Sequence, residues 1–156
     1  MIAPIAMEWA MALWQFDLEF VARRKASGSR NAVELSIDAD ALQKAEDLIR
    51  RQLASATSWS PDLRVWGEED GNRIDIYMNG KRCVGIALRV DLRTNPTAFC
   101  ELVIAFAQML DCSFVTTDGS LVPADMPSLR AAALRSNAWK FVWDPRGYLD
   151  SAPPID

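Results

Sequence analysis

The chain has 156 residues, of which half are hydrophobic and 24% are charged, and it contains three cysteines and no histidine. This length and composition are typical of one globular domain with its own core, and they exclude a disordered or fibrous chain. The absence of histidine excludes Ser-His-Asp and Cys-His catalytic arrangements and histidine-ligated zinc. The net charge of −4 argues against a surface for nucleic acid or anionic membranes.

The first twelve residues are apolar, but they do not have the pattern of a signal peptide. No Lys or Arg occurs before Arg23, and Glu8 interrupts the apolar run. We therefore expect residues 1–12 to form an N-terminal arm or a short helix. The odd number of cysteines, without a secretion signal or a Cys-x-x-Cys pair, predicts reduced thiols and a cytoplasmic location.

Two strands and a helix are predicted next. Apolar and polar residues alternate over 13–22 and again over 33–37, which is the pattern of half-buried strands. Trp14 falls on the apolar face of the first strand, so we expect it in the core. Asp38 has the position of a helix N-cap, and apolar residues follow it at three- and four-residue spacing. This helix is expected to end near Ser55.

Three more strands are predicted over 63–66, 73–78 and 83–92. The second and third should form a hairpin, because Asn79-Gly80 readily provides two residues with positive φ. The last strand has an unbroken apolar face, which is the strongest strand signal in the chain.

The last third of the chain is predicted to contain shorter elements. In order, these are a helix from Asn95-Pro96 to about Asp111, strands at 113–116 and 121–122, a helix over 127–136, a strand over 139–143 and an exposed tail over 144–156. The sequence of elements predicts a single α+β domain over residues 1–156, in which about three helices pack on one face of a mainly antiparallel sheet.

Four carboxyl groups are candidates for a metal site or an acid–base pair. Glu68, Glu69 and Asp70 follow one strand, and Asp75 lies on the next. Paired carboxylates can hold Mg²⁺ or Ca²⁺ or share acid and base roles. Their spacing matches no EF-hand loop, and no glycine-rich phosphate loop lies beside them. We interpret them as a solvated turn, with no metal and no cofactor.

The other reactive groups have simpler structural explanations. Cys100 lies near the start of a predicted helix, but its apolar neighbours indicate a core cysteine. Asp111, Asp118 and Asp125 fit a helix end, a turn and a helix cap. The sequence therefore predicts no catalytic residue.

An aromatic residue beside carboxylates is typical of an interface hot spot that faces a basic protein. Trp59 and Trp66 are expected to be partly exposed, although packing under a loop would explain both equally well. The predicted partner-binding residues are Trp66, Glu68, Glu69, Asp70 and Asp75.

Several segments between Leu35 and Leu149 together have a recognisable layout. They are the hairpin that begins Trp66-Gly-Glu-Glu-Asp-Gly-Asn-Arg-Ile-Asp-Ile, the strand 83–92, the helix 96–110, and the segments 111–119 and 140–149. In this layout the chain resembles the small bacterial immunity proteins encoded beside polymorphic or type VI secreted toxins. The resemblance implies a non-catalytic α+β protein that binds one toxin and blocks its active site or its maturation.

We therefore expect an immunity protein that is not an enzyme and that neutralises its toxin by stoichiometric binding. A type VI nuclease effector is the favoured toxin, because nuclease clefts are basic and an acidic inhibitor can be steered into them. The net charge of −4 does not select a nuclease over a lipase or a peptidoglycan hydrolase. Two alternatives are an adaptor or chaperone that loads a secreted effector and a small carboxylate- or metal-dependent enzyme.

Overall fold

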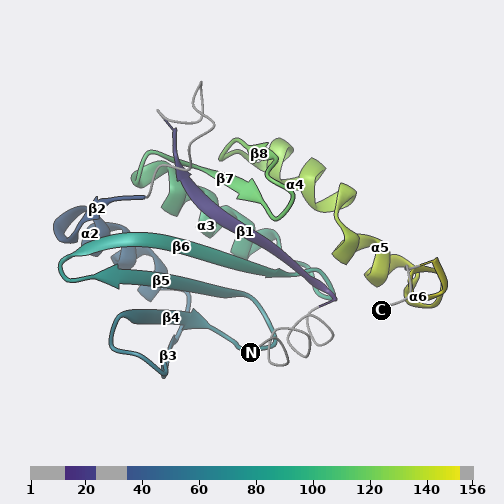
Figure 1. The fold of residues 1–156 in the computed structure, drawn as a ribbon, viewed down its shortest axis with the longest axis horizontal. Coiled ribbons are helices and arrows are strands. Elements are labelled where there is room, and N and C mark those ends of the chain that lie inside the picture. The colour runs from purple at the N-terminus through teal and green to yellow at the C-terminus, as the bar shows by residue number, and fades with distance from the viewer. Residues whose placement is uncertain (1–12, 24–34, 152–156) are drawn as a thin grey trace.

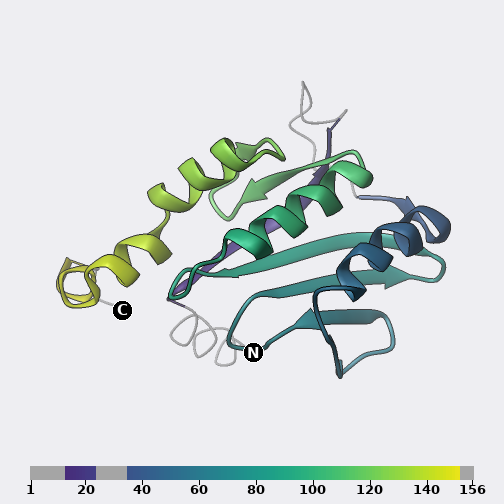
Figure 2. The ribbon, with the colours of Figure 1, turned by 180° about the vertical axis from the view of Figure 1, so that it is seen from behind.

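An antiparallel sheet forms one layer of the protein, and helices pack on one of its faces as the second layer (Figures 1 and 2). The computed structural model describes residues 13–23 and 35–151, which contain eight strands and five helices. This arrangement confirms the predicted α+β class and the antiparallel sheet. The described helices outnumber the three that we expected.

The first of the described strands lies inside the sheet rather than at its edge. The strands are β1 (Gln15–Ala22), β2 (Ile37–Asp38), β3 (Ser55–Ala56), β4 (Leu63–Gly67), β5 (Arg73–Asn79), β6 (Arg82–Asp91), β7 (Cys112–Thr116) and β8 (Leu121–Val122). Their order across the sheet is β3-β4-β5-β6-β1-β7-β8, and β2 pairs with the start of β6. Strand β1 therefore joins the β3–β6 meander to the β7–β8 hairpin.

The helices divide into a packed group and a projecting group. They are α2 (Ala39–Arg50), α3 (Thr97–Met109), α4 (Met126–Arg135), α5 (Asn137–Trp143) and α6 (Pro145–Ser151). Helices α2, α3 and α4 lie against the sheet, α5 contacts the sheet at β1 and buries Ala138 in the core, and α6 extends beyond the end of the sheet (Figure 2). None of the described helices is long and apolar enough to cross a membrane.

Alternate strand side chains point toward the helices and form the core. Phe20 of β1 packs against Phe106 of α3 and Phe114 of β7, with both pairs of ring centroids 5.4 Å apart. Leu18 and Leu88 face each other on β1 and β6, and both are buried. The predicted alternation is therefore confirmed for these two central strands.

Two local predictions are confirmed, the helix cap at Asp38 and the β5–β6 hairpin, although the turn of the hairpin lies at a different residue. The Asp38 carboxylate accepts a hydrogen bond from Ala41 N at 2.9 Å, so it caps α2 as expected. The β5–β6 hairpin also forms, but Asn79 still pairs with Arg82 in the ladder and only Gly80 has positive φ, at 63°. The turn therefore lies one residue later than Asn79-Gly80 would place it.

Other boundaries were wrong for identifiable reasons. Helix α2 ends at Arg50 rather than near Ser55, and Ser55–Ala56 pairs with β4 as strand β3. Residues 139–143 belong to helix α5 rather than to a strand, since the Ser136 hydroxyl accepts a hydrogen bond from Trp139 N and caps a new helix. Part of the expected tail is helix α6.

Some predictions concern residues that the structure does not describe. The N-terminal arm over 1–12 lies outside the described residues, as do residues 33 and 34 of the strand predicted over 33–37. Leu35 and Ile37 are buried and Ser36 is exposed, as the predicted alternation requires. Of these three residues only Ile37 belongs to a strand, β2, in which it pairs with Cys83 of β6.

Candidate functional site

The turn between β4 and β5 carries three of the predicted site residues, and we call residues 68–70 the acidic turn. Gly67 enters it with a φ of 100°, and a Cβ at that position would lie 2.2 Å from the carbonyl oxygen of Asn72. Only glycine fits this close approach without a shift of the backbone. Glu68 N then donates to Asn72 O at 3.0 Å, which closes the turn.

Side chains from distant parts of the chain hold the backbone of the acidic turn. Gln15 Nε2 donates to the carbonyl oxygen of Glu69 at 3.4 Å. The carbonyl oxygen of Asp70 accepts from Trp14 Nε1 at 3.3 Å and from Arg93 Nη2 at 2.8 Å. Three hydrogen bonds thus reach this turn from the start of β1 and the end of β6, and they restrict its backbone.

Arg93 is the centre of this arrangement. Its guanidinium lies over the Trp14 ring, 4.2 Å from the centroid, and bonds both carboxylate oxygens of Asp91 at 3.0 Å. Burial opposes ionisation of Asp91, but the hydrogen bonds and the charge of Arg93 outweigh it, so the pKa of Asp91 is lowered. The positive charge of Arg93 is therefore paired with Asp91.

The side chains of Glu68, Glu69 and Asp70 all belong to exposed residues. The groups that hold the turn bond its carbonyl oxygens, and no described cation forms an ion pair with these three carboxylates. The acidic turn therefore presents three adjacent carboxylates to solvent on a restrained backbone.

Trp66 does not belong to this surface, which corrects the expectation that it is partly exposed. It lies on the helix-facing side of β4, is 7% exposed and donates from Nε1 to Glu46 Oε2 at 3.3 Å. Arg64 Nη1 forms an ion pair with the same buried carboxylate, and Arg50 lies 5.8 Å from the Trp66 ring. Trp66 is adjacent to the acidic turn in sequence only. Trp59, in contrast, is exposed as expected.

Asp75 is also separate from the acidic turn. It lies on β5 between Val65 of β4 and Ala87 of β6, on the face of the sheet away from the helices. Its carboxylate is buried and accepts a hydrogen bond from Arg73 Nε at 2.6 Å. Of the five predicted partner-binding residues, the structure thus brings only Glu68, Glu69 and Asp70 together on one exposed surface.

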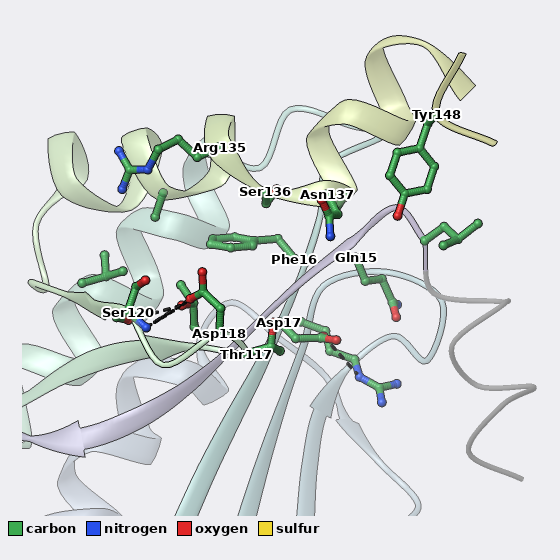
Figure 3. Close-up of a pocket in the computed structure, with 16 residues that line it drawn as sticks. Gln15, Phe16, Asp17, Thr117, Asp118, Ser120, Arg135, Ser136, Asn137 and Tyr148 are labelled. Atoms are coloured by element: carbon green, nitrogen blue, oxygen red, sulfur yellow. Dashed lines mark hydrogen bonds and ion pairs between the residues drawn. The ribbon is translucent and has the colours of Figure 1, made fainter. Parts of the chain in front are cut away.

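A cavity of about 430 Å³ lies beside the start of β1 (Figure 3). Gln15 and Phe16 form part of its wall, Asp118 comes from the β7–β8 turn, and Asn137 and Tyr148 come from α5 and α6. Its rim has charges of both signs, so it shows no preference for a cation or an anion. Gln15 connects the cavity to the acidic turn, because its amide bonds Glu69 O.

The cysteines are buried and unsuited to nucleophilic chemistry. Burial raises the pKa of Cys83 to about 11, that of Cys100 to about 11 and that of Cys112 to about 12. All three therefore remain neutral thiols near pH 7, as expected for core cysteines. Among the described residues, no three Asp, Glu or Cys side chains are placed to hold a metal ion.

Sequence reasoning missed the residues that hold the acidic turn. Trp14 was expected in the core, yet it is only half-buried and lies under Arg93. Gln15 and Arg93 were not singled out, since they lie 54 and 23 residues from the carbonyl oxygens that they bond. No local sequence pattern indicates such contacts. The pairing of β6 with β5 brings Arg93 to the turn, and the pairing of β1 with β6 brings Trp14 and Gln15 there.

No protein-family model matches the chain, and comparisons with curated proteins and with solved structures gave no match either. The resemblance to immunity proteins therefore stays a prediction.

Proposed function

We propose that the protein is a bacterial immunity protein that binds a secreted toxin stoichiometrically in the cytoplasm and neutralises it. A type VI nuclease effector is the proposed toxin. The acidic turn is the proposed contact surface. The observation that carries this proposal is the presentation of three exposed carboxylates on a turn whose carbonyl oxygens are bonded by Trp14, Gln15 and Arg93.

A restrained anionic turn suits the inhibition of a basic enzyme in two ways. The charges of Glu68, Glu69 and Asp70 attract a basic cleft during diffusional encounter and so raise the association rate. Because the backbone of the turn is already held, less conformational entropy is lost when the complex forms. Trp66 and Asp75 are left out of the proposed contact, since both side chains are buried.

The proposal is tested by co-expressing the chain with the product of the neighbouring gene. We expect capture of that product in a one-to-one complex by size-exclusion chromatography with light scattering. Deletion of the immunity gene alone should be toxic, and deletion of both genes should restore growth. Lower secretion of an effector without toxicity would contradict the proposal and support the adaptor alternative.

A metal screen addresses the enzyme alternative independently. A metal that binds the folded state raises the melting temperature. We expect no change with Mg²⁺, Mn²⁺ or Ca²⁺, and a saturable rise would contradict the interpretation of the acidic turn as a protein-binding surface.

A further inference from the structure

Strand β1 has an incomplete neighbour on one side. It pairs with β6 from Gln15 to Glu19, but its pairing with β7 begins only at Leu18, opposite Thr116. Beyond Thr116 the chain turns back into β8, with Gly119 N donating to Thr116 O at 3.0 Å. In the part of the chain that the structure describes, the sheet therefore has a notch beside the first residues of β1, where a continued β7 would lie, and the cavity of about 430 Å³ occupies it.

The ladder shows which backbone groups face this notch. Leu92 N donates to Trp14 O at 3.2 Å, so the backbone of Trp14 faces β6. Arg23 N donates to Asp111 O at 3.0 Å, so the backbone of Arg23 faces β7. Since successive strand residues direct their N–H and C=O groups to alternate sides, the backbone of Gln15 faces the notch. Within the described residues, Gln15 has no strand partner there.

The walls of the notch leave room for an extended chain. Asp118 and Ser120 lie on one side of Phe16, and the phenol of Tyr148 lies on the other (Figure 3). On the helix-facing side, Ala132 and Ala138 form a small apolar floor beside the ring of Phe16, and the polar residues Arg135, Ser136 and Asn137 line the rest of that side. A residue placed opposite Phe16 would direct its side chain onto this apolar floor.

We propose that the notch binds an extended segment of the partner protein, which adds a short strand antiparallel to β1 and in line with β7. Main-chain hydrogen bonds to Gln15 would provide affinity, and one apolar side chain on the floor beside Phe16 would provide selectivity. Because the rim carries charges of both signs, it selects neither an acidic nor a basic segment. We therefore expect the main chain of the segment to make the principal contacts. This inference rests on the proposed function, because the segment belongs to the toxin.

Two series of short peptides test the notch without the toxin. The first is blocked pentapeptides with threonine at four positions and Ala, Val, Ile, Leu or Phe at the centre. The second has the same side chains but N-methylated backbone amides, which cannot donate. We expect saturable shifts of the Gln15 amide in ¹⁵N NMR spectra of the full chain with the first series and at least tenfold weaker binding with the second. Absence of saturable shifts, or equal binding of both series, would overturn the inference.

Substitutions at Gln15 provide a matched pair. Gln15→Pro removes the N–H that faces the notch without removing a bond of the β1–β6 ladder, whereas Gln15→Ala removes only the side chain. We expect Gln15→Pro to lose at least tenfold in peptide affinity and Gln15→Ala to stay within about twofold of the unaltered chain. Equal affinities for the two folded variants would overturn the inference.

A further variant covers the case in which Gln15→Pro does not fold. Ala132→Val fills part of the apolar floor, so it should weaken binding of the Phe-centred peptide by about tenfold and leave the Ala-centred peptide within about twofold. Loss of both peptides to the same extent, or of neither, would overturn the proposed position of the central side chain.

Measurements of toxin affinity distinguish failure of this inference from failure of the proposed function. Both substitutions remove the hydrogen bond from the Gln15 side chain to the acidic turn, so the comparison is between the two variants. Toxin affinity at least tenfold lower in Gln15→Pro than in Gln15→Ala supports the inference. Equal toxin affinity of the two variants, with binding retained, overturns the inference and leaves the proposed function intact. Failure of the unaltered chain to bind the toxin overturns the proposed function, and with it the assignment of the segment to the toxin.

Discussion

Two regions of the molecule combine a tryptophan, an arginine and a carboxylate, and they use them differently. On the helix-facing side of β4, Glu46 is 3% exposed and bonds both Trp66 and Arg64. At the end of β6, Arg93 pairs with Asp91, covers Trp14 and bonds a carbonyl oxygen of the acidic turn.

The two regions differ in whether they leave carboxylates exposed and available to a binding partner. In the first region the carboxylate of Glu46 is buried and bonded internally, so it adds to the stability of the fold. In the second region the internal carboxylate is Asp91, and the three carboxylates of the acidic turn remain exposed while their backbone is held. Proximity of a tryptophan to acidic residues in the sequence therefore does not identify a binding surface.

The largest effect on stability is expected from a substitution at Gly67, the residue that precedes the acidic turn. Gly67→Ala adds a Cβ 2.2 Å from Asn72 O at a residue with positive φ, so we expect the free energy of unfolding to fall by about 3 kcal/mol in urea denaturation. Gly80→Ala is the control: its φ is also positive, but nothing lies within 4 Å of the added Cβ, so a loss of about 1 kcal/mol is expected. Equal losses would contradict the close approach.

A smaller loss is expected from the buried region. Glu46→Ala leaves the indole N–H of Trp66 without its acceptor, and we expect a loss of about 2 kcal/mol in the free energy of unfolding. Glu46→Gln keeps an acceptor for Trp66 and should lose less. Toxin affinity should be unchanged in both folded variants, and a tenfold loss would show that the buried region also contributes to the contact.

The support of the acidic turn is tested at Arg93. Arg93→Ala removes the strongest of the three hydrogen bonds to the turn and the partner of Asp91. We expect toxin affinity to fall by about tenfold, a loss comparable to one hydrogen bond to a charged group. Arg93→Lys keeps the positive charge but cannot make the paired hydrogen bonds of a guanidinium. Its toxin affinity should therefore lie between that of Arg93→Ala and that of the unaltered chain. Calorimetry measures the affinities; equal affinity of Arg93→Ala and the unaltered chain would contradict a supporting role.

The pH dependence of stability provides a weaker test of the same pair. The pKa of Asp91 is lowered in the folded chain, so its contribution is present above the unfolded value of about 4 and is lost as the pH falls below it. The difference in unfolding free energy between the unaltered chain and Arg93→Ala should therefore shrink between pH 6 and pH 3. A difference that does not vary with pH would contradict an ionic contribution from this pair.

The parts of the fold that depend on local patterns could be predicted. The alternation in β1 and β6 and the cap at Asp38 depend on residues close in sequence, and the structure confirms them. The pattern over 139–143 misled because a stretch of five residues fits a strand or a helix, and the cap at Ser136 decides between them.

The candidate site could be predicted only in part. Exposure of Glu68, Glu69 and Asp70 follows from their turn composition, whereas burial of Trp66 depends on Glu46 across 20 residues of sequence. The roles of Gln15 and Arg93 depend on strand order, which the sequence pattern does not specify.

The most direct test of the acidic turn measures association rates with the toxin by stopped flow at several salt concentrations. In the variant E68K/E69K/D70K we expect the association rate at low salt to fall by at least tenfold and to lose its salt dependence. The control D62K/E101K/D150K changes the net charge equally at exposed positions elsewhere, and it should fall by less than threefold. Equal effects of the two variants would contradict the claim that the acidic turn is the contact surface.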